Sequence, residues 1–196
     1  VAGDGWFIVS RAPGAAAAGD LLYTRAGDFR PDANGNLVNS AGFYLQGTTS
    51  AAGGALTAQG LQTVNVNRVP PGADSATLGA LASVEIGADG AVNANYANGE
   101  VHTIFRIPLA LFTNEAGLAL ADRTAVGATA LSGAAEIRAA QSGSAGAIEG
   151  SALEGSTVDI GEEFSALIAT QRAYSTGARI LSTADDLWRT LVSTAA

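Results

Sequence analysis

Few side chains in this chain of 196 residues could carry chemistry, because it contains one histidine and no cysteine. His102 lies in a strand-like run between Val101 and Thr103. A conventional zinc site needs further histidine or cysteine ligands, and a Ser-His-Asp triad needs partners in a recognisable context. Neither arrangement can be assembled from these residues, so we expect His102 to have a structural role.

Loop motifs for cations, phosphates or nucleophiles are also poorly matched. Residues 32–36 read Asp-Ala-Asn-Gly-Asn, but the further carboxylates at EF-hand spacing are missing. Because Asn-Gly tolerates positive φ, a β-hairpin turn is the better interpretation. Residues 142–146 lack the Gly-x-Ser-x-Gly order of a hydrolase elbow, and the carboxylates are scattered rather than paired as in glycosidases. We predict that the chain is not an enzyme and has no cofactor or metal site.

Charge and hydropathy exclude two further classes of partner. The net charge of −8 disfavours nucleic-acid binding, which requires a basic face. No run approaches the ~20 apolar residues of a membrane span, so no membrane insertion is expected. No signal peptide with a basic start and an apolar middle is recognisable, and we interpret the start at Val1 as a truncated or processed end.

The clearest structural signal is a long C-terminal helix. From Ile160 to Val192 the pattern advances in alternating steps of four and three residues, and a second such row runs beside it. The first seam comprises Ile160, Phe164, Leu167, Gln171, Tyr174, Ala178, Leu181, Asp185, Trp188 and Val192. The second seam comprises Ala166, Thr170, Ala173, Gly177, Ile180, Ala184, Leu187 and Leu191. Asp159 is the expected N-cap, with Glu162 completing a capping box.

Two apolar flanks require other helices as cover, and the rest of the chain offers none. The chain is therefore predicted to be one subunit of an assembly. The pattern alone is equally compatible with a simple two-helix core.

The remaining chain reads as short strands and turns. Strands are expected at residues 5–9, 21–24, 43–45, 61–69, 84–86, 92–94 and 101–111. Residues 121–150, rich in Ala, Gly and Ser, are expected to form an irregular connection. The predicted fold is mainly β, an irregular domain of hairpins with one long C-terminal α-helix that packs in an assembly. We expect a discontinuous β-rich domain from residues 1–75 and 76–150, followed by a helical segment at 151–196.

Three passages together resemble the bacterial flagellar axial proteins, the family of rod, hook and hook-associated subunits. Residues 5–9 with 23–38 are similar to the family's "GxGFF" strand and "YTRxGxFxxDxxGxLV" hairpin. The second passage joins residues 98–100, 107–112 and 114–118. The third joins residues 153–159, 171–174 and 182–187, where the family has "SNVD", "QRAY" and "STxD". Residues 96–100 are more similar to the hook subunits than to those of the distal rod.

Departures from the family pattern mark two places where segments are expected to be missing. Nothing helical precedes Gly5, although family members begin with a helix that pairs with the C-terminal one. Hook subunits carry an outer β domain, whereas here Ser75 and Ala76 join the two halves almost directly. Thr157 stands where the family usually has Asn.

The resemblance implies a structural function, with the distal rod as the alternative to the hook. Hook subunits polymerise into a flexible hollow tube that transmits torque from rod to filament at the cell exterior. The implied partners are neighbouring copies, the rod, the hook cap, the hook–filament junction proteins and the flagellar type III exporter, which needs no cleavable signal peptide. A secreted β-rich binding or adhesin module is a further alternative from another class.

In that setting the helix surface divides into two kinds of residue. The expected interhelical contacts are Ile160, Phe164, Leu167, Gln171, Tyr174, Ala178, Ile180, Leu181, Leu187, Trp188 and Leu191. The remaining stripe is narrow and polar, and its expected channel-facing members are Arg172, Thr176, Arg179, Thr183 and Asp186. A helix covered on both flanks and wet along one strip suits the wall of a water-filled channel.

Overall fold

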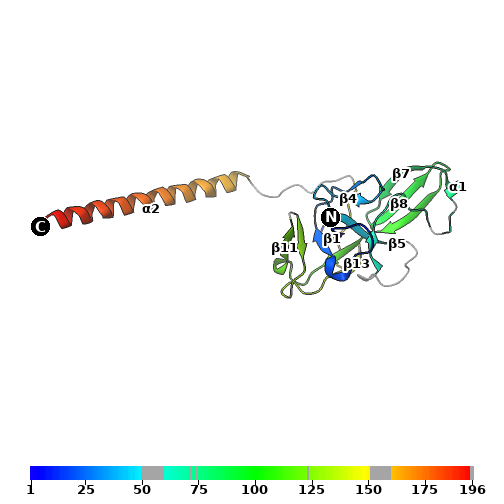
Figure 1. The fold of residues 1–196 in the computed structure, drawn as a ribbon, viewed down its shortest axis with the longest axis horizontal. Helices are drawn as coiled ribbons and strands as arrows, with labels where there is room; N and C mark the ends of the chain where they lie inside the picture. Colours follow the sequence, from blue (N-terminus) through cyan, green and yellow to red (C-terminus); the bar gives the residue numbers. More distant parts are fainter. Residues whose placement is uncertain (50–59, 71, 74, 123, 151–159, 195–196) are drawn as a thin grey trace. The chain divides into compact units, whose positions relative to one another are not determined.

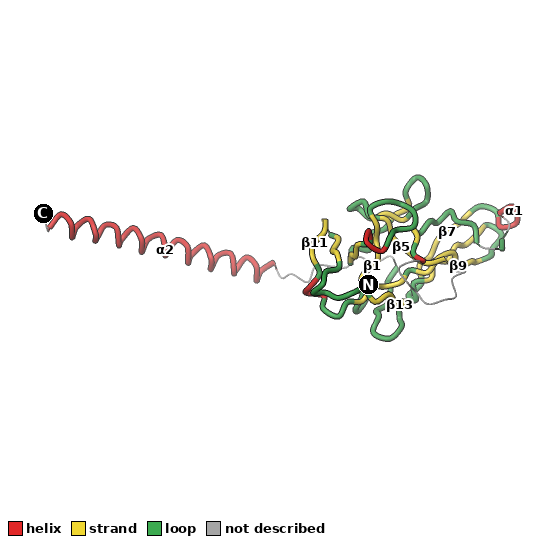
Figure 2. Tube along the Cα trace, turned by 60° about the horizontal axis from the view of Figure 1, so that its bottom comes forward, coloured by secondary structure: helices red, strands yellow, loops and turns green. Residues whose placement is uncertain are grey.

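The structure, a computed structural model, describes residues 1–49, 60–70, 72–73, 75–122, 124–150 and 160–194. The chain divides into two compact units, Val1–Glu154 and Gly155–Ala196, which are treated separately below. We call them the β unit and the helical unit. Figure 2 shows the β unit as strands and loops with short helical turns such as α1, and the helical unit as one long helix, α2.

The β unit consists of short strands joined by tight turns. Its first strands are β1 (Trp6–Ser10), β2 (Leu22–Thr24), β3 (Arg30–Pro31), β4 (Leu37–Val38), β5 (Tyr44–Thr49) and β6 (Gln62–Thr63). Its later strands are β7 (Leu81–Ile86), β8 (Ala91–Tyr96), β9 (Val101–Arg106), β10 (Pro108–Leu111), β11 (Ala119–Asp122), β12 (Ala125–Gly127) and β13 (Glu136–Ala139). Among the described residues, short helical turns occur at η1 (Ala18–Asp20), α1 (Ser75–Leu78) and η3 (Glu115–Gly117).

The sheet is antiparallel and runs in the order β11-β12-β2-β1-β5-β9-β8-β7 (Figure 1). Strand β1 pairs with three other strands, β2, β5 and β10. Ile8 lies opposite Tyr23 of β2, and Phe7 lies opposite Leu109 of β10. The two halves of the chain therefore share one sheet, joined where β1 meets β10 and where β5 meets β9.

Aliphatic side chains from both halves form the core. The fully buried members include Ile8, Val9, Leu45, Val64, Val92, Ile104 and Leu109. Phe7 adds an edge-to-face contact with Phe29, their ring centroids 5.4 Å apart. This enclosure of apolar area is the main source of the β unit's stability.

A buried glutamine fastens three segments together at polar positions of the core. The Nε2 of Gln46 donates to the Oγ of Ser10 at 2.8 Å and to the Oγ1 of Thr63 at 3.0 Å. Those hydroxyls donate in turn to the carbonyls of Ala12 and Gly14. Because both hydroxyl protons are used in this way, the amide nitrogen of Gln46 must face them. The network ties β1, β5 and β6 to the loop after β1.

The predicted fold class is confirmed, and most expected strands lie where the pattern indicated. The expected irregular connection over residues 121–150 is wrong in part, since β12 and β13 lie within it. Strand β13 pairs with β10 through four residues, from Pro108 opposite Ala139 to Leu111 opposite Glu136. These strands form by backbone pairing with neighbouring strands, β12 with β2 and β13 with β10. Backbone pairing does not require an alternating pattern of apolar side chains, so the sequence pattern did not indicate them.

Two other expectations are revised by the structure. The run 101–111 is two strands rather than one, and the change of partner from β8 to β1 and β13 falls at Ile107. The expected strand over 61–69 is regular only at Gln62–Thr63, with a further bridge between Asn36 and Asn65. The short helix α1 begins at Ser75, beside the place where an outer domain is expected to be missing, and that expectation stays a prediction. The expected N-cap, Asp159, lies outside the described residues.

Candidate assembly surface

Helix α2 (Ile160–Thr194) spans 35 residues, as its sequence predicts. It contains no proline, and its glycines are Gly161 and Gly177, so nothing in its interior forbids regular backbone hydrogen bonding. At about 1.5 Å per residue its length is roughly 52 Å. A helix of this length can present the same kind of surface to several neighbours at once.

The large apolar side chains of α2 are exposed, with Tyr174 83% and Trp188 68% accessible. The other exposed large apolar members of the two predicted seams are Phe164, Leu167, Ile180, Leu181, Leu187 and Leu191. Ala178 and Gln171 are exposed as well, while the side chain of Ile160 is not among those described. Apolar area of this extent on one element marks an interaction surface rather than scattered exposure.

The two seams follow a strict seven-residue repeat along the helix. A straight helix of 3.6 residues per turn drifts by about 20° per heptad against such a repeat, so each seam winds slowly around α2. Partner helices that follow the seams must coil left-handedly around it. The repeat therefore suits long helical partners.

The predicted channel-facing stripe is polar and exposed at Arg172, Thr176, Arg179 and Thr183. The hydroxyl of Thr183 donates to the carbonyl of Arg179 at 2.9 Å, so it is used within the helix. The side chain of Asp186 is outside the described set. The predicted set of interhelical contact residues omitted Ile168, whose side chain is 49% exposed at the margin of this stripe. Testing every third and fourth residue from Phe164 could have found it.

One polar member of the first seam already has a partner inside the helix. Asp185 forms an i,i+4 ion pair with Arg189, whose Nη2 lies 3.2 Å from the carboxylate. Both side chains are largely exposed, and such pairs contribute only about 0.2–0.5 kcal/mol to helix stability. An interhelical role for Asp185 would have to compete with this local pair.

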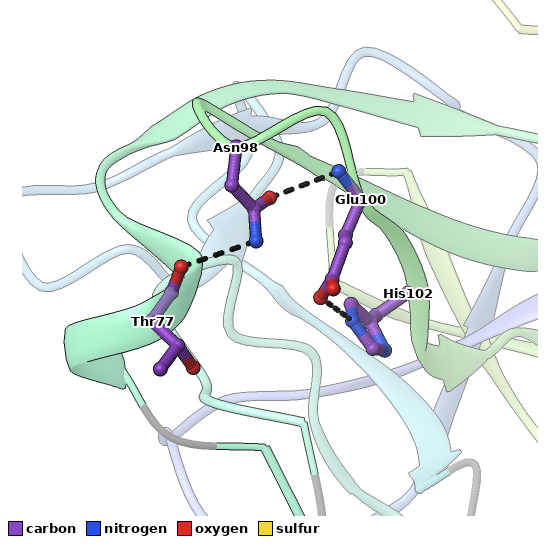
Figure 3. A network of polar contacts seen from close by, with 4 residues as sticks. All are labelled: Thr77, Asn98, Glu100 and His102. Atoms are coloured by element: carbon purple, nitrogen blue, oxygen red, sulfur yellow. Dashed lines mark hydrogen bonds and ion pairs between the residues drawn. The ribbon is translucent and has the colours of Figure 1, made fainter.

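His102 takes part in a small polar network at the tip of the β8–β9 hairpin (Figure 3). Its Nε2 lies 3.0 Å from the Oε2 of Glu100. The side chain of Asn98 accepts a hydrogen bond from the Glu100 amide at 2.9 Å and donates one to the carbonyl of Thr77 at 3.1 Å. The hydrogen bond from His102, with a contribution from Asn98, lowers the pKa of Glu100. The network fastens the hairpin tip to α1, which is a structural role.

The Asp32 turn has the geometry of a hairpin rather than of a cation site. The Oδ1 of Asp32 accepts hydrogen bonds from the amides of Asn34 and Asn36, both at 2.8 Å, and its Oδ2 accepts one from the Asn36 side chain. Desolvation acts to raise the pKa of Asp32, but the hydrogen bonds from Asn36, Asn34 and Gly35 outweigh it and hold that pKa below its usual value. The carboxylate is occupied by its own turn.

Aromatic side chains of the β unit are used in internal packing. The guanidinium of Arg25 lies 5.2 Å from the ring centroid of Trp6, and Tyr23 packs edge to face against Phe112. Over the part of the chain that the structure describes, no group of three potential metal ligands occurs, and no helix is long and apolar enough to cross a membrane.

Comparison with known proteins decides the family. The family model for the D1 domain of flagellar hook protein FlgE/F/G matches residues 1–94. The model for the C-terminal region of the flagellar basal body rod FlgEFG proteins matches residues 149–194, which includes all of α2. The chain belongs to the flagellar hook and rod protein family. The resemblance inferred from the sequence passages is thereby confirmed.

Among the relatives of this chain, a flagellar hook protein FlgE from Caulobacter vibrioides is 37% identical over 74% of this chain and 24% of its own length. The flagellar hook protein FlgE of Escherichia coli is 32% identical over 83% of this chain and 42% of its own length. A flagellar basal-body rod protein FlgG from Agrobacterium fabrum is 32% identical over 95% of this chain and 60% of its own. The chain thus spans between about a quarter and three fifths of the length of these relatives.

Proposed function

We propose that this protein is a structural subunit of the bacterial flagellar hook, where copies polymerise into a flexible hollow tube that transmits torque from rod to filament. The observation that carries the proposal is helix α2, whose apolar seams are exposed over most of its length in a chain of the hook and rod family. Exposed seams of this kind are stabilised only when other helices cover them.

In the polymer, the seam residues make interhelical contacts. These residues are Ile160, Phe164, Leu167, Gln171, Tyr174, Ala178, Ile180, Leu181, Leu187, Trp188 and Leu191. The discontinuous β-rich domain formed by residues 1–75 and 76–150 supplies a rigid body between neighbouring copies, and the segment 151–196 supplies the inner helical layer. A family-type N-terminal helix is the proposed partner of α2.

The polar stripe of α2 is proposed to face the channel through Arg172, Thr176, Arg179, Thr183 and Asp186. The exposure of the two arginines supports this assignment, because a guanidinium is costly to bury without a carboxylate partner. A map of the assembled tube in which Arg172 and Arg179 lie between helices would contradict it.

The distal rod is the second candidate, and one observation favours it. The rod relative aligns over 95% of this chain and over a larger share of its own length than the hook relatives do. The hook is preferred because residues 96–100 match the hook subunits better and because a hook relative has the higher identity, 37% against 32%.

Location and partners follow from the proposed assembly. The subunit lies in the flagellum outside the cell, after export through the flagellar type III apparatus. It contacts further copies of itself, the rod below it, and the hook cap and hook–filament junction proteins above it. Catalysis forms no part of the proposed role.

Immunogold labelling of isolated flagella tests the choice between hook and rod. An antibody raised against residues 1–150 should label the curved segment outside the basal body along its whole length. Labelling confined to the straight rod would support the rod assignment instead. Absence of label from both structures would contradict the proposed function.

A further inference from the structure

Two hairpin turns of the β unit contain the same tripeptide, Ala-Asn-Gly, at residues 33–35 and 97–99. Gly35 and Gly99 have φ of +85° and +87°, and each donates its amide to the carbonyl three residues earlier, at 3.0 and 2.9 Å. Asparagine before glycine is prone to deamidation, because glycine has no side chain to hinder attack of its nitrogen on the asparagine amide. Since the two turns share this tripeptide and its backbone, their surroundings can be compared directly.

The turn at Gly35 is clamped on both sides of the Asn34–Gly35 peptide. The carbonyl of Asn34 accepts hydrogen bonds from the side chains of Asn65 and Asn67 at 3.0 and 3.4 Å. The carbonyl of Gly35 accepts one from the Val66 amide at 2.8 Å. Gly35 is buried, and a Cβ placed on it would lie 2.5 Å from the Nδ2 of Asn67. Rotation of this peptide toward ring closure would break these hydrogen bonds.

The turn at Gly99 is open to solvent. Asn98, Gly99 and Glu100 are all exposed, and no atom lies within 4 Å of a Cβ placed on Gly99. Among the described residues, the structure gives no hydrogen bond to the carbonyl of Asn98 or of Gly99. This peptide can therefore rotate at little cost, and water can reach it.

The side chain of Asn98 is held in a way that activates its amide carbon (Figure 3). Its Oδ1 accepts a hydrogen bond from the Glu100 amide at 2.9 Å, and its Nδ2 donates one to the Thr77 carbonyl at 3.1 Å. Attack on the amide carbon moves negative charge onto Oδ1, where the N–H of Glu100 stabilises it as the donors of an oxyanion hole do. In the other turn the equivalent amide, that of Asn36, donates to Asp32 instead.

From these observations we propose that Asn98 is a site of spontaneous deamidation in the folded protein. The Gly99 nitrogen loses its proton to solvent base and attacks the Cγ of Asn98. The N–Cγ bond forms, the Cγ–Nδ2 bond breaks, and ammonia leaves with a proton taken from water, which gives a cyclic succinimide. Water then opens the ring: addition at Cγ gives aspartate, and addition at the main-chain carbonyl carbon gives isoaspartate. Water is the co-reactant, and nothing is oxidised or reduced.

The turn at Asp89 shows what aspartate does at the equivalent position. There the Oδ1 of Asp89 accepts a hydrogen bond from the Ala91 amide at 3.1 Å, so a carboxylate can replace the amide oxygen in this turn. Neither product at position 98 can donate to the Thr77 carbonyl, because an ionised carboxylate has acceptors only. Deamidation therefore releases the tip of the β8–β9 hairpin from α1. The proposal does not depend on the hook assignment.

Peptide mapping by mass spectrometry tests the site. The full chain is kept folded at mildly alkaline pH, and aspartate and isoaspartate at positions 34 and 98 are measured over time. The same rates measured in urea correct for flanking residues and should agree within about twofold. After that correction, Asn98 in the folded protein should convert at least about tenfold faster than Asn34, which must first open its clamp. Equal rates, faster conversion of Asn34, or no conversion of Asn98 would overturn the assignment.

A variant that loosens the clamp tests the physical cause. Asn65→Ala removes a hydrogen bond to the Asn34 carbonyl and should raise the rate at Asn34 at least about threefold. The rate at Asn98 in the same protein should stay unchanged, which shows that the rest of the β unit is folded. An unchanged rate at Asn34 would show that the clamp does not cause the difference.

Hydrogen exchange tests the consequence for the hairpin tip. The amide of Ala97 donates to the Ala80 carbonyl at 2.9 Å and reports whether the tip stays attached beside α1. Asn98→Asp, which reproduces one product, should make this amide exchange about fivefold faster, because one hydrogen bond of the attachment is lost. Asn34→Asp is the matched control, with the same change of charge, and should leave exchange at Ala97 unaltered. Unaltered exchange in both variants would contradict the proposed release.

Discussion

The β unit and helix α2 differ in how far their apolar side chains are buried. In the β unit, Ile104 and Leu109 are completely enclosed by strands of the same chain, and the amide nitrogen of the buried Gln46 donates hydrogen bonds to Ser10 and Thr63. In α2, Tyr174 and Leu181 are 83% and 73% exposed. The β unit is thus stabilised from within, whereas α2 leaves these apolar side chains uncovered within its own unit.

Truncating one leucine in each region should give the largest contrast. Leu109→Ala should lower the free energy of unfolding of the β unit by about 2–5 kcal/mol, because it leaves a cavity in an enclosed core. Leu181→Ala, at an exposed site, should change that quantity by less than about 0.5 kcal/mol and should instead impair polymerisation. Urea unfolding of the monomer followed by tryptophan fluorescence measures the first effect, and sedimentation measures the second.

An equal loss of monomer stability in both variants would remove the distinction between the two regions. It would indicate that Leu181 is covered within the free monomer.

Glycine substitutions sharpen the same contrast at the level of the backbone. Gly90 has φ of +79°, and a Cβ there would lie 2.4 Å from the Ile107 carbonyl oxygen. Gly90→Ala should therefore destabilise the β unit by about 1–3 kcal/mol from the backbone conformation alone, with the steric clash adding to it. The midpoint of thermal unfolding measures this effect. Gly99→Ala is the matched control, since Gly99 has φ of +87° but open space around its Cβ.

Gly177→Ala should stabilise the free monomer, in contrast to Gly90→Ala, which should destabilise it. No atom lies within 4 Å of a Cβ placed there, so alanine should stabilise the helix by roughly 1 kcal/mol of intrinsic propensity. Circular dichroism at 222 nm should show a higher helix content. The added methyl group should at the same time weaken assembly if Gly177 permits close helix approach in the polymer. Unchanged polymerisation would show that no partner helix packs closely at this position.

The smallest expected effect concerns pH and is confined to the β unit. The pKa of Asp32 is lower in the folded state than in the unfolded chain, so its contribution to stability is present above the unfolded value of about 4 and is lost as the pH falls through the folded value. Asp32→Asn should flatten the loss of stability between pH 5 and about pH 2, measured as the urea midpoint. If the urea midpoints of the two proteins fall in parallel as the pH is lowered, Asp32 does not contribute to the loss of stability in acid. Asp28 and Glu100, whose pKa values are also lowered, should leave some acid sensitivity.

The helix and the hairpin turns could be predicted because their signals are local. The spacing from Phe164 to Leu191 indicates a helix with two apolar flanks, and the Asp-Ala-Asn-Gly-Asn segment forms the turn that its residues favour. Each depends on residues within a few positions of one another, which is the range over which backbone preferences and side-chain hydrogen bonds act. The motif resemblance added the family.

Only the tertiary structure decided which strands share an edge and which apolar residues remain outside. The pairing of β1 with β10 joins residues about a hundred positions apart, and β13 forms by pairing with the other edge of β10. The exposure of Leu120 and Leu131 could not be inferred from a stretch that looked like an irregular, small-residue connection. Such features depend on long-range backbone pairing and packing, to which nearly any small or apolar residue can contribute. The sequence by itself therefore determined the helix and the turns, whereas the three-dimensional arrangement determined which apolar side chains of the β unit stay exposed.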